Sequence, residues 1–481
     1  MPGQPTTRWQ VSGYRFMVRR MERALVRRDV RTATDPMRAQ ARSLVVGVVL
    51  AVLGLAACGV LALLRPQQAI ADHTIVMGNE SGGLYVVLGD RVHPALNLAS
   101  ARLAVGQAAE PAIVAESELA QRPRGPLVGI PGAPTALPYG DSSDSSDSGA
   151  LAWTVCDRVD GDVLSTAVVG GAPVGGDDRA GELDPGRVLL VEHAGVAYLV
   201  YDGHRARVDL RDRAVTGALA LDGVAPRPVS AGLLGAIPEV PPISAPRIDG
   251  AGTRPTHRLR DVEVGSVVAV PRGESNSYYV VLRSGVQQIG AATADLIRFT
   301  DSRGETDIRR IAPDVLAAVP LVTELDVATF PDAAPAVLGA GDTPVSCLSW
   351  QSDSLVRVLS GRELPVEAAA RAVGLAQADG SGPLADEAYL EPGAGTYVQA
   401  TGITADSTRR GGLFYVADTG VRYGIADSAT AAMLGLTAEP EPAPWAIVTL
   451  LAPGPVLSQE QARIAHDGVA ADPAPAALSS E

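Results

Sequence analysis

The residues best suited to chemistry in this sequence are few and scattered. The chain has 481 residues with six histidines and three cysteines, and it contains no H-E-x-x-H, C-x-x-C or G-x-S-x-G motif. A Ser-His-Asp set that assembles only in three dimensions would leave no local mark, so that alternative stays open. We expect structural or loop roles for the histidines, and a turn at His93-Pro94.

Phosphate chemistry also lacks its usual residues. The sequence contains no lysine, so all 40 basic residues are arginines, and a P-loop lysine, a Schiff base and a kinase-type lysine are excluded. The glycine pairs at 170–171 and 175–176 stand beside Asp177 and Asp178, whose charges would repel phosphate oxygens. The enzyme question therefore leans towards no: a conventional ATPase is unsupported, and a site built from arginines and carboxylates remains an alternative without a motif.

Charge and hydropathy divide the chain into two environments. Residues 1–42 hold ten arginines and three acids, a net charge of +7, so a total of −14 leaves −21 for the remainder. Residues 43–64 follow, from Ser43 to Leu64, and contain no charged residue. As a helix they would be about 33 Å long, close to the roughly 30 Å of a bilayer core. We predict one transmembrane helix with residues 1–42 in the cytoplasm and the rest outside.

Two other interpretations of the apolar segment are weaker. A cleaved signal peptide has a shorter basic region and an apolar stretch of about 7–15 residues. Residues 55–58, ending in Cys58, resemble a lipoprotein cleavage box, but six further apolar residues continue the span. An uncleaved helix is therefore favoured.

The cytoplasmic segment predicts a basic amphipathic helix. Apolar side chains recur with helical spacing, and arginines lie largely off that stripe. The stripe consists of Tyr14, Met17, Val18, Met21 and Leu25. Such a helix either lies on an anionic leaflet or docks on a partner, and the plain alternative is a helix that only sets topology.

Four stretches of the exported part share one pattern. Each has a tyrosine in a short apolar strand, a glycine turn, a second short strand and an Ala-rich helix, which predicts a β-hairpin feeding a helix. The tyrosines are Tyr85, Tyr198, Tyr279 and Tyr415. We expect them in the core of the repeats rather than at a ligand. Their irregular intervals argue against a tight solenoid and predict four copies joined by long connections that supply a central domain.

Composition assigns the remaining segments. With aromatics at only 4%, the core must consist mainly of Ala, Val and Leu. Residues 123–138 and 226–246 are rich in proline and predict linkers. The acidic serine run at 141–148 predicts a disordered loop, since the glycine and glutamate of an EF-hand are missing. The net charge of −14 argues against nucleic-acid binding.

Cys156 and Cys347 are the only cysteines outside the span, and an oxidising compartment predicts a disulfide between them. Two unrelated thiols are the alternative.

Four stretches of the sequence are specific enough to compare with known families: QVSGYRF at 10–16 with Arg19-Arg20, RVHPALNLASARL at 91–103, PRGPLVGIPGAP at 123–134 and WTVCD at 153–157. In these stretches, their order and the single apolar span, the sequence resembles the EccB family, the membrane-anchored core component of type VII (ESX) secretion systems. The resemblance implies an α+β exported domain in which four β-hairpin/helix repeats surround a central β-rich core in a distorted, propeller-like arrangement. It also implies an inner-membrane assembly with an EccC-like ATPase, EccD, EccE and other EccB copies, which contact one another in the periplasm. We expect no cofactor or metal, and ATP is considered as a ligand only because members of the family are sometimes labelled ATPases.

These observations give nine expected segments. They are a cytoplasmic basic helix (1–42), the transmembrane helix (43–64), a first repeat domain (65–138), an acidic loop with a core segment (139–190), a second repeat domain (191–245), a third (246–325), a core segment (326–400), a fourth repeat domain (401–464) and a disordered tail (465–481). The leading functional hypothesis is a structural scaffold of a secretion complex. The alternatives are an ATP-hydrolysing component and a cell-envelope-binding module, the latter weakened by the scarcity of aromatic residues.

Overall fold

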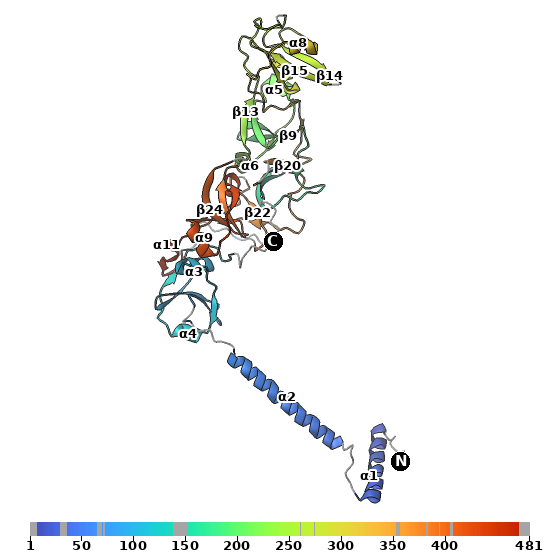
Figure 1. The fold of residues 1–481 in the computed structure, drawn as a ribbon, viewed down its shortest axis with the longest axis vertical. Helices are drawn as coiled ribbons and strands as arrows, with labels where there is room; N and C mark the ends of the chain where they lie inside the picture. Colours follow the sequence, from blue (N-terminus) through green and yellow to red (C-terminus); the bar gives the residue numbers. More distant parts are fainter. Residues whose placement is uncertain are drawn as a thin grey trace. The chain divides into compact units, whose positions relative to one another are not determined.

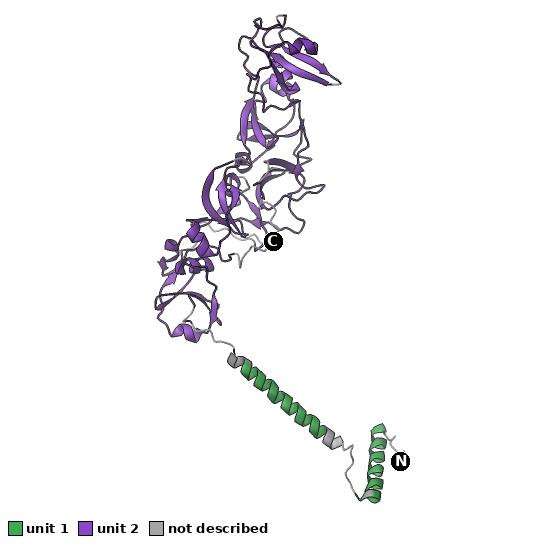
Figure 2. Ribbon diagram, in the orientation of Figure 1, with its two compact units in different colours: residues 1–69 green, residues 70–481 purple. Residues whose placement is uncertain are grey.

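The chain divides into two compact units, residues 1–69 and residues 70–481 (Figure 2). The computed structural model describes residues 7–28, 36–64, 70, 73–137, 152–259, 261–273, 275–352, 356–380, 383–393, 395–404 and 407–470. The acidic run at 141–148 and residues 471–481 lie outside the described residues.

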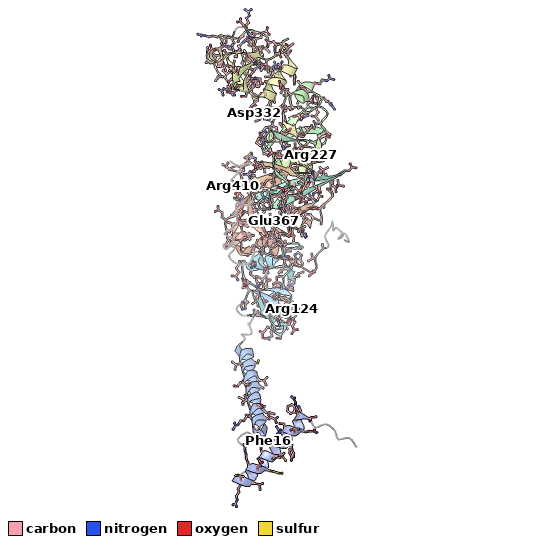
Figure 3. All side chains as sticks on the ribbon, turned by 90° about the vertical axis from the view of Figure 1, so that its right-hand side faces the viewer. Phe16, Arg124, Arg227, Asp332, Glu367 and Arg410 are labelled. Carbon is pink, nitrogen blue, oxygen red and sulfur yellow. A yellow bond between two sulfur atoms is a disulfide. The ribbon has the colours of Figure 1, made fainter. Side chains whose placement is uncertain are left out.

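The first unit contains two helices, α1 (Arg8–Arg27) and α2 (Pro36–Leu64). A capping box formed by Thr7 and Gln10 satisfies backbone donors at the start of α1. The apolar stripe from Tyr14 to Leu25 is exposed on α1, and Phe16 is labelled on the same helix in Figure 3. Within α2, Gln40–Val60 is long and apolar enough to cross a membrane. The predicted span at 43–64 lies inside α2, which begins seven residues earlier.

Four small sheets recur along the second unit (Figure 1). Small sheet 1 contains β1 (Ile75–Gly78), β2 (Leu84–Leu88), β3 (Arg91–Pro94) and β4 (Ala112–Val114). Small sheet 2 contains β9 (Arg187–His193), β10 (Val196–Tyr201), β11 (His204–Val208), β12 (Arg227–Pro228) and β13 (Glu239–Ile243). Small sheet 3 contains β14 (Val267–Arg272), β15 (Ser275–Val281), β16 (Val286–Ile289) and β17 (Arg309–Arg310). Small sheet 4 contains β23 (Thr396–Thr401), β24 (Arg410–Val416), β25 (Val421–Ile425), β26 (Glu441–Pro444) and β27 (Ala452–Pro453).

The small sheets share one strand order. In each, three consecutive strands form an antiparallel meander, a helix follows the third strand, and the next strand returns parallel to the first. The helices are α3 (Leu98–Val105), α5 (Arg213–Ala218), α7 (Ala291–Thr300) and α9 (Ser428–Leu434). A second short helix comes after each returning strand: α4 (Glu116–Ala120), α6 (Ala231–Ala236), α8 (Pro313–Ala317) and α10 (Trp445–Val448).

A seven-stranded central sheet lies apart from this pattern. Its strands come from two distant stretches of chain and run in the order β21-β22-β7-β6-β19-β20-β8. They are β6 (Ala152–Asp160), β7 (Val163–Gly170), β8 (Gly181–Glu182), β19 (Val345–Gln351), β20 (Arg357–Gly361), β21 (Val373–Gly374) and β22 (Glu387–Tyr389). In addition, β18 (Ala336–Val337) pairs with β9 and so links the approach to β19 with small sheet 2.

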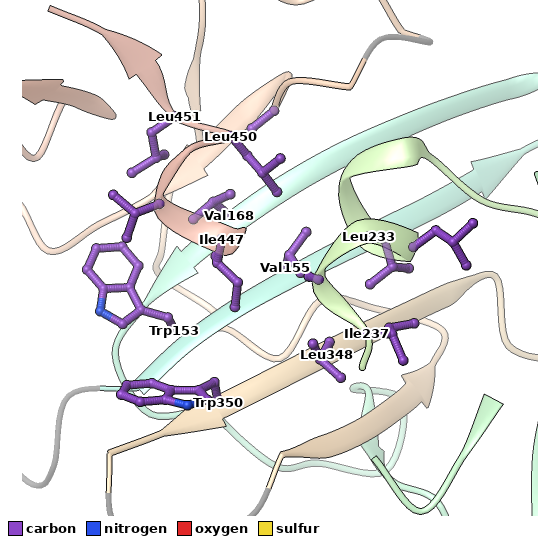
Figure 4. Packing of buried hydrophobic residues seen from close by; sticks show 14 of the residues in the cluster. Trp153, Val155, Val168, Leu233, Ile237, Leu348, Trp350, Ile447, Leu450 and Leu451 are labelled. Carbon is purple, nitrogen blue, oxygen red and sulfur yellow. The ribbon is translucent and has the colours of Figure 1, made fainter. Parts of the chain in front are cut away.

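Helix pairs join the sheets to one another. Small sheets 1 and 4 meet where α3 packs on α9, and small sheets 2 and 3 meet where α5 packs on α7. Helices α6 and α10 pack together against the central sheet, whose apolar face forms the largest core cluster (Figure 4). The facing residues are mainly Ala, Val and Leu, as the composition requires. The central sheet therefore contacts small sheets 2 and 4 through one shared core.

Several expectations need correction. The propeller-like arrangement is not confirmed, because no sheet formed by the described residues closes on itself. Residues 226–246 are not a linker, since they hold β12, α6 and β13. Small sheets 2 and 4 begin at Arg187 and Thr396, a few residues before the expected boundaries.

The expected tail also differs at its start. After α11 (Gln459–Ala462), the short strand β28 (Ala465–His466) pairs with β5 (Leu127–Val128) next to small sheet 1. His466 further contacts the backbone carbonyl of Gly129 through its Nε2 atom, 2.9 Å away. Pairing with a strand more than 300 residues earlier fixes this segment, and composition alone does not reveal it.

Candidate functional site: a cross-linked junction in the central sheet

A disulfide fastens the middle of the central sheet. Cys156 of β6 and Cys347 of β19 stand directly opposite each other in the antiparallel register and are bonded. Both are buried, at 0% and 1% exposure. The bond closes a sequence separation of 191 residues, from the strand after small sheet 1 to the strand after small sheet 3. It therefore covalently links two stretches of chain that the fold brings together only at this sheet.

Asp157, the residue after Cys156, is a fully buried carboxylate. Its Oδ2 atom accepts a hydrogen bond from the Ser230 backbone N–H (2.6 Å), and Oδ1 accepts from the Ser230 hydroxyl (2.9 Å) and the Thr166 hydroxyl (2.8 Å). Burial raises the pKa of Asp157 to about 6, against the effect of these hydrogen bonds, and the nearby charge of Asp386 raises it further. Ser230 is the N-cap of α6, so Asp157 fixes the start of that helix on the central sheet.

Asp386 makes a second set of bonds beside the first. Its Oδ2 atom accepts from the Thr166 N–H (2.8 Å), and Oδ1 accepts from the N–H groups of Asp379 (3.0 Å) and Gly380 (2.9 Å). Thr166 thus bonds to both carboxylates, through its hydroxyl to Asp157 and through its backbone to Asp386. The two acids connect β6, β7, α6 and the 379–380 turn.

Paired carboxylates are a common catalytic arrangement, but these two lack access. Asp157 has no exposed surface and Asp386 is 8% exposed. Their oxygens accept hydrogen bonds from the chain's own donors, so no oxygen of Asp157 is free to meet a substrate. Within the described residues, no group of three or more His, Cys, Asp or Glu side chains is arranged to hold a metal ion. The arrangement holds elements together rather than performing acid–base chemistry.

Arg227, labelled in Figure 3, is a buried cation that bonds next to Asp157: its partner Ser346 stands opposite Asp157 in the register of β19 and β6. Its Nη1 atom donates to the Thr343 carbonyl (2.8 Å) and the Ser346 hydroxyl (3.3 Å), and Nη2 donates to the Leu338 carbonyl (2.8 Å) and the Thr343 hydroxyl (3.1 Å). Burial lowers the pKa of Arg227 to about 10. The guanidinium therefore fixes the segment that leads into β19, and its last partner, Ser346, directly precedes Cys347.

Replacing Arg227 tests this role. Arg227→Met leaves the half-buried carbonyls of Leu338 and Thr343 without those donors, so we expect a loss of about 2 kcal/mol in the free energy of unfolding. Denaturant titration of the full chain in detergent, followed by tryptophan fluorescence, measures the loss. Arg207→Met, at an exposed position of β11, is the matched control and should change stability by less than about 0.5 kcal/mol. Equal effects of the two substitutions would contradict the role.

Two tryptophans complete the junction. Trp153 and Trp350 are cross-strand partners on β6 and β19 and are 0% and 3% exposed. Figure 4 shows Trp153 near Ile447 of α10, whereas Leu233 of α6 and the following Ile237 lie farther along the same core cluster. Two of the chain's few aromatic residues are thus used where small sheet 2, small sheet 4 and the central sheet meet.

The repeat tyrosines all lie on the second strand of a small sheet. Tyr279 and Tyr415 are buried at 5% and 3% exposure, whereas Tyr85 and Tyr198 are half-buried. The Arg124 guanidinium lies 6.0 Å from the centroid of the Tyr85 ring, and the Arg205 guanidinium 5.4 Å from that of Tyr198. The structure keeps the four far apart in the fold, one in each small sheet.

The histidines mostly bond to backbone. Ring nitrogens of His93, His193, His204, His257 and His466 lie 2.9–3.1 Å from backbone carbonyl oxygens. His93 lies in β3 and not in a turn, so that expectation is wrong; its strand pairs with β2. The glycine pairs at 170–171 and 175–176 end β7 and enter the connection to β8, where Asp178 lies 4.0 Å from Arg362.

Sequence reasoning missed Asp157, Asp386, Ser230 and Arg227. The only signal was an aspartate directly after Cys156, and a buried carboxylate requires partners whose positions the sequence does not provide.

The fold and this junction define a class: a protein with one candidate membrane span, followed by a large α+β domain built on a cross-linked central sheet. The model of the family "Type VII secretion system ESX-1, transport TM domain B" matches residues 3–471. The chain belongs to this EccB family.

Similar proteins cover nearly the whole chain. The "ESX-3 secretion system ATPase EccB3" of Mycolicibacterium smegmatis is 39% identical over 97% of this chain and 92% of its own length. The "ESX-1 secretion system ATPase EccB1" of Mycobacterium tuberculosis is 36% identical over 98% and 97%. Among solved structures, a chain of an intact ESX-5 inner membrane complex matches with a TM-score of 0.75 and 32% identity, covering 100% of this chain and 99% of that chain. The EccB3 dimer from the ESX-3 core complex matches with a TM-score of 0.72 and 37% identity, covering 82% and 100%.

Proposed function

We propose that the chain is a structural core component of a type VII (ESX) secretion membrane complex. The observation that carries this proposal is the match, along the whole chain, to a subunit of the ESX-5 inner membrane complex. The buried charges and the disulfide support it, because they stabilise one arrangement of the central sheet and its neighbouring helices and offer no open catalytic group.

The topology we propose places the N-terminus in the cytoplasm and residues after 64 in the periplasm. Ten arginines before the span support a cytoplasmic N-terminus. A disulfide between Cys156 and Cys347 supports an oxidising compartment for the second unit. There the domain contributes to a periplasmic layer by contact with other copies, as in the EccB3 dimer of the related ESX-3 complex.

The partners we propose are an EccC-like ATPase, EccD and EccE, together with other copies of the chain. The exposed stripe of α1, with arginines around it, supports docking of the N-terminal helix on a partner or on the anionic leaflet. Nucleic acid is not among the expected partners.

We also propose that the four small sheets are copies of one repeated unit. Their common strand order, the tyrosine on the second strand and the two helices at corresponding places support this origin. Contacts run from small sheet 1 to 4 and from 2 to 3, with the central sheet between 4 and 2. This order supports a row of repeats about the central sheet more than a ring.

Hydrolysis of ATP is the second candidate, and it rests on the names of the relatives, which include "ATPase". The absence of lysine from the sequence removes the usual phosphate-binding side chain. We therefore assign turnover in the complex first to the EccC-like partner.

Gentle detergent extraction of the tagged full chain from its own membranes tests the proposal. On a native gel with mass spectrometry, we expect it in a large complex with an EccC-like ATPase and multi-span proteins. The matched control is the same tag on a chain that lacks residues 1–69, which removes α1 and α2. A wild-type chain that runs alone as a monomer or small oligomer would contradict the scaffold role. Turnover of ATP by the purified chain, measured in parallel, would instead support the second candidate.

A further inference from the structure

An apolar groove lies on the surface of small sheet 4. It has a volume of about 660 Å³ and is formed by the ends of β23 and β24 and the start of α10. Phe414 and Trp445 form one wall with their rings stacked, the centroids 5.2 Å apart. Trp445 is 41% exposed, in contrast to the buried Trp153 and Trp350. An exposed stacked pair in a chain with so few aromatic residues is a feature that folding alone does not require.

Glycines keep the floor of this groove open. Gly411 and Gly412 lie at a bulge of β24, where the register with β23 shifts between Gln399 and Thr401. A Cβ atom on Gly412 would lie 3.4 Å from the Phe414 ring, an ordinary contact, so the fold itself does not demand glycine there. Glycine within a strand often marks a place where another backbone approaches closely. The apolar surface continues past Phe414 over Gly424 to Val456, which is 58% exposed.

Three arginines surround the aromatic wall. Arg409 and Arg410 line the groove, and the Arg422 guanidinium lies 5.1 Å from the centroid of the Trp445 ring. None of the ion pairs among the described residues involves these three arginines. Residues 43–481 together carry a net charge of −21, so three neighbouring arginines form a local cationic patch on an otherwise acidic part of the chain. Its complement is an anionic partner.

The remaining lining selects among anionic ligands. Besides the arginines, its polar side chain is Thr401, whose hydroxyl already bonds to the Arg409 carbonyl (3.1 Å) and to Arg410 (3.4 Å). Sugars need several amide or carboxylate partners for their hydroxyl groups, and this lining has none. An open strand surface, apolar walls and a cationic rim suit an extended peptide with apolar side chains between acidic ones.

We propose that this groove docks an extended, acidic and apolar segment of a partner protein. Its apolar side chains lie on Phe414 and Trp445, its backbone passes over Gly411 and Gly412, and its carboxylates face the arginines. The proposal concerns the chain alone and does not depend on its membership of a secretion complex.

Fluorescence anisotropy of the full chain in nanodiscs tests it. The probe is a labelled peptide, Asp-Glu-Pro-Leu-Trp-Pro-Leu-Asp-Glu, and the matched peptide carries lysine at each acidic position. We expect binding of the acidic peptide, weakened by added salt, and none of the basic one. Gly412→Val fills the floor, and Arg409→Gln with Arg410→Gln removes two charges; each should weaken binding at least about tenfold.

Each variant has a matched control elsewhere in the fold. Gly374→Val adds the same side chain to a strand glycine of β21 with open space around it. Arg309→Gln with Arg310→Gln removes an exposed arginine pair from β17. We expect both controls to bind as the unaltered chain does, and thermal unfolding shows that each variant is folded.

Four results would overturn the proposal. They are no binding of the acidic peptide, equal losses in the controls, displacement of the peptide by ATP or by peptidoglycan fragments, and loss of self-association in the groove variants, which would make the occupant a second copy. The groove variants are also run on the native gel. A variant that loses peptide binding but still migrates in the large complex shows that the groove and the scaffold role are separate.

Discussion

Replacing both Cys156 and Cys347 by alanine is expected to be the most destabilising change that leaves the core packing nearly intact. The disulfide closes a sequence separation of 191 residues, and the chain-entropy estimate for loops of that length is about 5 kcal/mol. The loss arises mainly because the reduced unfolded chain gains conformational freedom. Denaturant titration of the full chain in detergent, with and without reductant, measures it.

The third cysteine supplies the control. Cys58 is exposed in α2 and is not part of the disulfide, so Cys58→Ala should leave both the stability and its response to reductant unchanged. In the double variant, reductant should have no further effect. If the unaltered chain unfolds at the same denaturant concentration in both conditions, the bond contributes nothing measurable.

The cost of losing this bond follows from what it connects. Strands β6 and β19 belong to stretches separated by small sheets 2 and 3, and the core between α6, α10 and the central sheet forms only when they pair. We therefore expect the reduced chain to lose the arrangement of small sheets 2 and 4 before the hairpins within them, which rest on local contacts.

Local features of the fold were predictable from the sequence. Tyr85, Tyr198, Tyr279 and Tyr415 each mark a strand followed by a turn and a second strand, and these pairings span only a few residues. The long helix α2 was predictable as well, because the length and apolar composition of the segment that begins at Ser43 are enough to indicate a helix.

Long-range pairings were not predictable in this way. In the sheet, β6 pairs on one side with β7, which follows it directly, and on the other with the distant β19, and only the two cysteines indicated the second pairing. Ser230 reaches Asp157 across 73 residues, and Thr166 reaches Asp386 across 220. Proline-rich residues 226–246 suggested a linker because composition does not reveal that Arg227 and Ser230 bond into the central sheet.

The second large effect concerns pH and Asp157. Its pKa in the fold is raised to about 6 from an ordinary value of 3.8 because the carboxyl is buried near Asp386. The folded chain therefore binds a proton more tightly than the unfolded chain between these values. The stabilisation is fully present below about pH 4 and is lost as the pH rises through about 6, with an amplitude of about 3 kcal/mol.

A difference measurement isolates this group. Other acids shift in the opposite direction: hydrogen bonds from backbone N–H groups lower the pKa of Glu116 and of Asp427. Subtracting the unfolding free energies of Asp157→Asn from those of the unaltered chain, from pH 4 to pH 7, cancels such contributions. We expect the unaltered chain to lose stability relative to the variant as the pH rises.

An exposed aspartate in a neighbouring turn supplies the control for Asp157→Asn. Asp162→Asn, in the exposed turn between β6 and β7, should show no comparable pH-dependent difference. A flat difference for Asp157→Asn as well would mean that Asp157 is ionised throughout, with its three hydrogen bonds outweighing burial. If instead the unfolding free energy of the unaltered chain falls relative to that of the variant as the pH rises, Asp157 is protonated in the folded chain at mildly acidic pH. The contact between the central sheet and α6 would then be most stable at mildly acidic pH.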